Sequence, residues 1–169
     1  MKVLVTYYSE TGNTEKIAQA IFEGIGHKKV EKEILPISEV KDLEDYDLIF
    51  CGFPVHGSSV PGKVEPFLKG MPKDKKLAIF STHGSLRGGQ LAVHAFEYAA
   101  TLAAKAKIIG TFGCRGKVKH ALIEALMKKP EHKAWAEEAQ SSARLHPDDA
   151  DLHDGRDFGK KMLKKVIEP

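Results

Sequence analysis

The feature that most constrains this chain is a series of five short apolar segments, separated by segments whose apolar residues recur at helical spacing. The apolar segments lie at residues 2–8, 30–37, 48–53, 77–81 and 107–112. The segment at 48–53, Leu-Ile-Phe-Cys-Gly-Phe, shows no alternation, as expected of a strand buried on both faces of a parallel sheet. Strands that alternate with helices are joined by right-handed crossovers, which place helices on both faces. The sequence therefore predicts an α/β fold around a five-stranded parallel sheet.

The last third of the chain differs in character from the rest. Residues 117–145 have helical spacing but are rich in charge, and Pro130 divides them into two segments. We interpret residues 116–147 as a helical excursion that follows the fifth strand. Residues 148–167 predict a final helix, because acidic side chains occupy its first turn and lysines its last turn, which complements the helix dipole. The prediction is a single domain over residues 1–169.

Composition argues against several classes of partner. The 169 residues include 26 Lys plus Arg and 23 Asp plus Glu, and the net charge of +3 is spread evenly, so nucleic-acid binding has little electrostatic support. No stretch approaches the roughly 18 consecutive apolar residues of a membrane span, and the first apolar segment is shorter than a signal-peptide core. Cys51 and Cys114 form no Cys-x-x-Cys pair. We expect a cytoplasmic protein with reduced thiols.

A run of small and polar residues follows the first strand and opens the first helix. The run consists of Ser9, Glu10, Thr11, Gly12, Asn13 and Thr14. Free backbone N–H groups and the positive end of the helix dipole favour an anion at such a point. Hydroxyls and an amide add donors, and because no side chain in the run is a cation, it suits a dianionic phosphate held by dipoles. The alternative is an ordinary helix cap, for which one such residue would suffice.

This Ser-x-Thr-Gly-Asn-Thr loop resembles the phosphate loop of flavodoxins and related FMN proteins, and the segment VLVTYYSETGNTEKIAQAI is similar to their whole opening unit. The resemblance extends over most of the chain. It implies the strand order 2-1-3-4-5, an FMN cofactor with its phosphate on residues 9–14, and an isoalloxazine ring between the loops after the third and fourth strands. Carried over by position, the residues beside the ring are Pro54, Val55, His56 and Gly57 on one side, and Thr82, His83, Gly84 and Ser85 on the other.

Two properties of these ring segments bear on their chemistry. Backbone N–H groups near the ring would control its reduction potential, and His56 and His83 could place positive charge near a reduced, anionic flavin. The alternative for each histidine is packing against the ring without proton transfer. Electron-carrier flavodoxins are acidic and stack the ring between Trp and Tyr, whereas the ring segments here have no aromatic beyond Phe53, and Trp135 lies in the excursion. This departure favours a ring that is open to a substrate or a second cofactor.

Residues after the fifth strand fall at the same edge of the predicted sheet. Arg115 or Lys117 would meet an anionic substrate or the acidic surface of a redox partner, or else would be solvated in a turn. Cys114 is expected to be a small apolar packing residue rather than a nucleophile, because no histidine pattern marks it as activated.

Other motifs fail on the residues that carry their chemistry. Residues 57–64 match Gly-x-x-x-x-Gly-Lys but end in Val64, where a P-loop needs Ser or Thr to bind magnesium. The acidic stretch 146–155 does not fit a calcium loop, since Lys160 falls where the loop needs Glu, so we interpret it as an acidic helix start and expect no metal site. No Gly-x-Ser-x-Gly elbow of a serine hydrolase occurs.

These observations predict an FMN-binding redox protein that moves electrons between partner proteins or to a small acceptor, as a flavodoxin-type carrier or an FMN-dependent, quinone-type oxidoreductase. The alternative is a non-redox module on the same scaffold that recognises a phosphorylated ligand or a protein. The oligomeric state stays open, because apolar side chains of the excursion could cover the domain's own sheet or another subunit.

Overall fold

A five-stranded sheet forms the centre of the protein in the computed structural model, which describes residues 1–26, 29–85 and 88–168. The strands are β1 (Lys2–Tyr7), β2 (Glu31–Pro36), β3 (Leu48–Pro54), β4 (Lys76–His83) and β5 (Lys107–Arg115). Their order is β2-β1-β3-β4-β5, and every neighbouring pair is parallel. The predicted strand order and the predicted parallel sheet are therefore confirmed.

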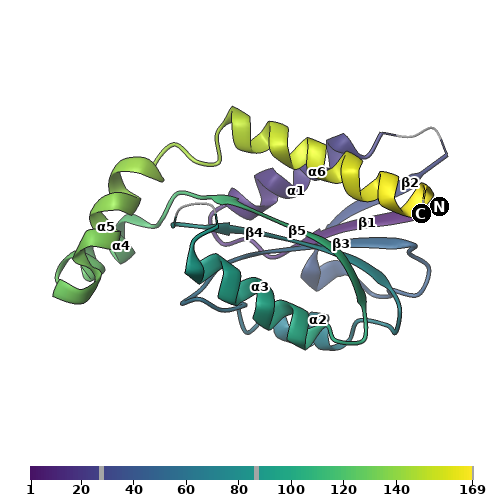
Figure 1. Ribbon diagram of the computed structural model, residues 1–169, viewed down its shortest axis with the longest axis horizontal. Coiled ribbons are helices and arrows are strands. Elements are labelled where there is room, and N and C mark those ends of the chain that lie inside the picture. The colour runs from purple at the N-terminus through teal and green to yellow at the C-terminus, as the bar shows by residue number, and fades with distance from the viewer. Residues whose placement is uncertain (27–28, 86–87, 169) are drawn as a thin grey trace.

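Helices cover both faces of this sheet. The described helices are α1 (Asn13–Gly24), α2 (Glu65–Lys69), α3 (Gln90–Leu102), α4 (His120–Met127), α5 (Pro130–Ser142) and α6 (Asp149–Ile167), with a 3-10 turn η1 (Ile37–Glu39) after β2. In Figure 1, α1 and α6 lie above the sheet and α2 and α3 lie below it. The predicted final helix is α6, and it packs on the sheet beside α1.

Each face of the sheet has its own apolar core. On the α1 and α6 side, Phe50 and Phe80 of the sheet pack with Phe158 and Met162 of α6. On the α2 and α3 side the core is built from Ile49, Phe53, Leu68, Ile79 and Ala95, among others. Strands buried on both faces explain why the apolar segments of β3 and β4 show no alternation.

Two strands are longer than their apolar patterns predict. β4 continues through Thr82 and His83, and β5 continues through Arg115 instead of ending at residue 112. The register pairs Thr82 with Cys114 and His83 with Arg115, so backbone pairing extends beyond the last apolar side chains. Pro54 likewise is the last residue of β3 rather than the residue after it. As a result, several candidate site residues lie on strand ends rather than in loops.

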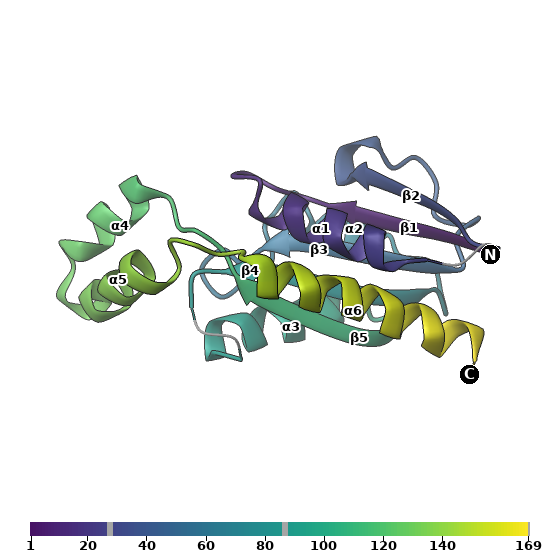
Figure 2. The same ribbon diagram turned by 90° about the horizontal axis from the view of Figure 1, so that it is seen from above.

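The excursion projects past the carboxyl ends of the strands as the helical pair α4 and α5 (Figures 1 and 2). Its two ends meet where the backbone N–H of Lys117 donates to the carbonyl of His146 at 2.9 Å. α6 then begins with a capping box in which Asp148 and Asp151 each accept from the other's backbone N–H. The interpretation of the acidic stretch as a helix start is confirmed.

Among the described residues, no helix combines the length and the apolar composition that crossing a membrane requires.

Candidate functional site

The first helix begins directly beyond the carboxyl end of β1 without a side-chain cap. Gly12 is the N-cap residue with φ of +83°, a left-handed conformation that glycine adopts without strain. Within the described residues no side chain caps α1, and Ser9 instead accepts a hydrogen bond from the N–H of Gly12 at 3.1 Å. The cap expected in an ordinary helix is therefore not formed. The first-turn N–H groups of α1 are available to an anion.

Side chains of residues 9–14, the candidate phosphate loop, connect this loop to distant segments. The hydroxyls of Thr14 and Thr82 lie 2.9 Å apart, and both residues are buried. The amide of Asn13 donates to the carbonyl of Lys117 at 2.9 Å. Thr11 is exposed. The loop is thus held against the end of β4 and against the start of the excursion.

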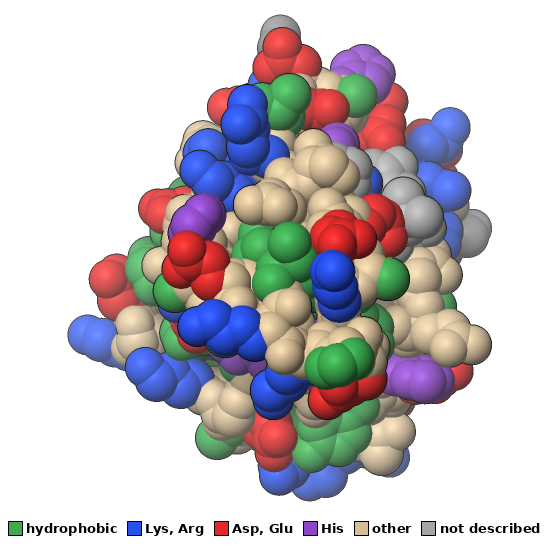
Figure 3. Space-filling view, turned by 90° about the vertical axis from the view of Figure 1, so that its left-hand side faces the viewer, with side chains coloured by type: hydrophobic (Ala, Val, Ile, Leu, Met, Phe, Trp, Pro, Cys, Tyr) green, Lys and Arg blue, Asp and Glu red, His purple; other side chains and the backbone are tan. Residues whose placement is uncertain are grey.

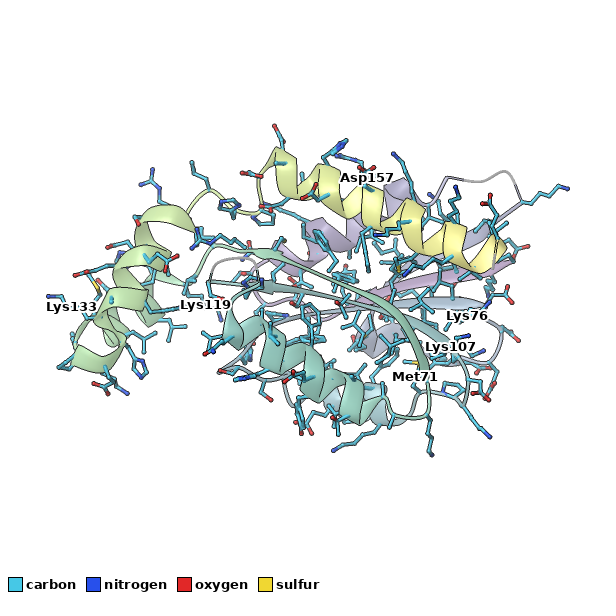
Figure 4. All side chains as sticks on the ribbon, in the orientation of Figure 1. Met71, Lys76, Lys107, Lys119, Lys133 and Asp157 are labelled. Atoms are coloured by element: carbon cyan, nitrogen blue, oxygen red, sulfur yellow. The ribbon has the colours of Figure 1, made fainter. Side chains whose placement is uncertain are left out.

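The carboxylate of Glu10 contacts side chains from three segments of the chain. It accepts from the Tyr8 hydroxyl at 3.0 Å and from Lys119 Nζ at 2.7 Å, and it lies 3.5 Å from His56 Nε2. The hydrogen bonds from Lys119 and Tyr8 hold the pKa of this carboxyl below its ordinary value. Figure 4 shows Lys119 at the point where the excursion leaves the sheet. The sequence does not predict this role of Lys119, because Lys119 and Glu10 are 109 residues apart in the chain.

The segment after β3 forms a tight turn beside the phosphate loop. Gly57 and Ser58 both have positive φ, and His56 and Ser59 exchange backbone hydrogen bonds at 3.0 and 2.9 Å. Two central residues with positive φ are typical of a type I′ turn. The turn leaves the His56 side chain exposed, with Nε2 close to the carboxylate of Glu10.

The segment after β3 is also joined to β4. The backbone N–H of Val55, next to Pro54, donates to the carbonyl of Thr82 at 2.9 Å. The two predicted ring segments, 54–57 and 82–85, are therefore neighbours at the carboxyl edge of the sheet, where open α/β folds bind ligands.

His83 occupies a packed position rather than an open one. Its ring is buried, Nδ1 lies 2.9 Å from the carbonyl of Ser85, and a Cβ on Gly113 would lie 3.2 Å from Nε2 and 3.3 Å from the ring of Phe96. The imidazole thus lies between β5 and α3. The ring of His83 therefore packs against the protein itself, and its place beside a flavin ring stays a prediction.

Gly84 is covered by the excursion. A Cβ on Gly84 would lie 2.5 Å from Cγ2 of Val118 and 2.9 Å from Cζ2 of Trp135. Only glycine leaves room for these neighbours. The single tryptophan of the chain, which is remote from the site in sequence, therefore packs on one of the predicted ring residues.

Arg115 has neither of the environments expected for it. It is 9% exposed, its Nε donates to the carbonyl of Ser85 at 3.2 Å, and its Nη2 lies 2.6 Å from a carboxylate oxygen of Glu138. It is neither solvated in a turn nor open to a substrate. The reason is that β5 runs to residue 115 and α5 covers its end. Cys114 is buried, as expected of a packing residue.

Charge at this end of the molecule is mixed. On the face shown in Figure 3, Lys and Arg side chains are interspersed with Asp and Glu side chains. This pattern differs from the continuous basic stripe of a nucleic-acid-binding surface.

Comparison with known proteins places the chain in a family. The sequence profile of the flavodoxin domain matches residues 4–160. The chain belongs to the flavodoxin domain family. The flavodoxin-like domain-containing protein BilS of Clostridioides difficile is 30% identical to it, over 98% of each chain.

Solved flavodoxins share its fold. A flavodoxin from the domain Archaea superposes with a TM-score of 0.66 at 20% identity, over 99% of this chain and 100% of that one. The two-electron reduced flavodoxin of Megasphaera elsdenii gives a TM-score of 0.56 at 26% identity, over 83% of this chain and 99% of that one. The flavodoxin fold predicted from the opening loop is thus confirmed.

Proposed function

We propose that this flavodoxin-family protein binds FMN at the carboxyl edge of its sheet and transfers electrons from a donor to a partner protein or a small acceptor. The observation that carries the proposal is the start of α1, where a left-handed Gly12 leaves the first-turn N–H groups without a side-chain cap. Contacts of residues 9–14 with Thr82 of β4 and with His56 after β3 support a site whose parts are already in position before a ligand binds.

The residues present fit a flavin phosphate. Residues 9–14 offer backbone N–H groups and the hydroxyl of Thr11 to the phosphate oxygens, while the carboxylate of Glu10 is turned to Lys119 and Tyr8. Neutral donors therefore face the anion, and the negative side chain in the loop is engaged elsewhere.

The ring would lie against segments 54–57 and 82–85, whose small residues and backbone donors set its polarity. When bound, FMN supplies the electron-transfer chemistry. This chain contributes an anchor for the phosphate, exclusion of water from the ring by the two segments, and a histidine, His56, that can hold a proton beside Glu10. The M. elsdenii relative has been solved in a two-electron reduced state, which supports a redox role for the fold.

We also propose that the protein works in the cytoplasm, where the buried thiols of Cys51 and Cys114 would remain reduced. A docking surface for the electron donor or acceptor would lie at the same edge of the sheet, near the residues that would hold the ring.

The test is flavin binding that depends on the phosphate. The purified protein is mixed with excess FMN, desalted and examined by visible absorption, and its affinities for FMN and riboflavin are then compared. Retained colour and weaker binding of riboflavin, which lacks the phosphate, are expected. Thr11→Val should weaken FMN binding about tenfold, the effect of losing one hydrogen bond to a charged group, and leave riboflavin binding unchanged.

Thr101→Val is the matched control, because Thr101 is exposed on α3 and its hydroxyl donates to the carbonyl of Glu97 in the same helix. It should bind FMN as the unsubstituted protein does. A folded protein that retains no flavin would refute the proposal and favour a non-redox binding module. Equal affinity for FMN and riboflavin would refute the assignment of the phosphate loop.

A further inference from the structure

Arg115 is a buried cation at the end of β5, next to one of the ring segments. Its guanidinium bonds in two directions, to the backbone carbonyl of Ser85 and to the carboxylate of Glu138 in α5. Its register partner across the sheet is His83, whose carbonyl accepts from the N–H of Gly116. A buried charge is costly unless it is paired, and the planar fork of arginine is suited to holding two acceptors at once.

One face of α5 holds this segment in two ways. Trp135 and Glu138 are three residues apart in the helix, so their side chains lie on the same face. Trp135 packs directly on Gly84, and Glu138 acts on Ser85 through Arg115. Residues 84 and 85 are thus contacted by the excursion as well as by His83 at the end of β4.

The excursion is also fastened to the phosphate loop. The backbone N–H of Lys117 donates to the carbonyl of His146, and the carbonyl of Lys117 accepts from the amide of Asn13. Lys119 Nζ donates to the carboxylate of Glu10. A Cβ on Gly116 would lie 2.9 Å from the amide nitrogen of Asn13, so the two segments approach closely. The same short connection therefore contacts both parts of the proposed flavin site.

We propose that Arg115 is a positioning residue of the flavin site and that Glu138 of the excursion sets its effect. Arg115 fixes the backbone of 84–85 and places a positive charge beside the ring segment, and Glu138 partly neutralises that charge. The excursion is then a working part of the site rather than an appendage. This inference rests on the proposed binding of FMN.

Substitutions of Arg115 and of Glu138 should shift the flavin reduction potential in opposite directions. A positive charge near the ring favours the reduced, anionic flavin. Arg115→Met removes that charge and should lower the potential, whereas Glu138→Gln removes its counter-charge and should raise it. Loosening of the segment alone would shift both variants in the same direction, toward the potential of free FMN. Opposite signs therefore distinguish an electrostatic role from a merely structural one.

The matched control is Glu137→Gln. Glu137 is the neighbouring residue of the same helix, and it pairs with Lys133 at 3.8 Å on the exposed side. Figure 4 shows Lys133 in the part of the excursion remote from the sheet. This control removes the same charge from the same helix, and it should leave both the potential and the FMN affinity unchanged.

The experiment uses the full chain loaded with FMN. Potentials are measured by anaerobic redox titration, and dissociation constants by quenching of Trp135 fluorescence, for which the chain has one tryptophan. Arg115→Met is expected to weaken FMN binding about 2- to 30-fold, the range typical of residues that act on a site through their neighbours. Because Glu138 is 44% exposed at its side chain, Glu138→Gln should fold even if Arg115→Met does not.

Each outcome decides the inference. A potential that rises in Glu138→Gln relative to Glu137→Gln supports it, and a lower potential in Arg115→Met strengthens it. Equal potentials in Glu138→Gln and Glu137→Gln, or shifts of the same sign in the Arg115 and Glu138 variants, would overturn it while FMN binding stands. Failure of the unsubstituted protein to bind FMN would overturn both the proposed function and this inference.

Discussion

The contact between Thr14 and Thr82 offers a test of how the phosphate loop is attached to the sheet. Their hydroxyls lie 2.9 Å apart, and the residues are only 1% and 4% exposed. Thr14→Val or Thr82→Val alone leaves the other hydroxyl buried without this partner, which typically costs about 1–3 kcal/mol. Replacing both removes both polar atoms, so the double variant should lose clearly less stability than the sum of the single variants.

Urea unfolding of the FMN-free protein measures this coupling for the two single variants, the double variant and Thr101→Val. In a chain of this length, 1 kcal/mol corresponds to about 2–4 °C in melting temperature, so thermal unfolding gives an independent estimate. A hydroxyl has one donor and two acceptor lone pairs, which lets Thr14 accept from Thr82 while it donates to a phosphate. Thr14→Val should therefore weaken FMN binding more than Thr82→Val.

Two results would refute this reasoning. Additive losses of stability in the double variant would mean that the two hydroxyls do not depend on each other. Equal loss of FMN affinity in Thr14→Val and Thr82→Val would mean that Thr14 supports the loop only through β4 and does not face the phosphate.

Two further predictions concern packing and pH. Gly24→Ala should destabilise the protein by about 1–3 kcal/mol, because its Cβ would lie 2.7 Å from backbone carbons of α6. Gly26→Ala should be nearly neutral in thermal unfolding, because its Cβ would have no described residue beyond its chain neighbours within 4 Å. Glu10 has a lowered pKa in the folded state, so its contribution to stability is present above the ordinary glutamate pKa of 4.5 and is lost as pH falls through the lowered value. Lys119→Met should flatten this acid dependence in urea unfolding measured from pH 7 to pH 3, and an unchanged slope would contradict the assigned partner.

Much of the fold could be predicted because its signals are local. The apolar runs at 48–53 and 77–81 identify buried strands through their own composition, and the loop 9–14 follows a strand directly. The lengths of β4 and β5 were underestimated at Thr82, His83 and Arg115, because backbone pairing there depends on the neighbouring strand and not on apolar side chains.

The features of the site likewise separate into those that local sequence predicts and those that depend on tertiary packing. The sequence by itself determined the α/β class, the strand order implied by the family resemblance, and the candidate phosphate loop. Only the tertiary structure decided that Thr14 meets Thr82, that Asn13 holds Lys117, that His83 is packed beneath α3, and that Arg115 is buried against α5. The first two contacts join residues 68 and 104 positions apart. The physical reason is that a strand or a loop is specified by neighbouring residues, whereas the environment of a polar side chain is set by whichever distant element the folded chain packs beside it.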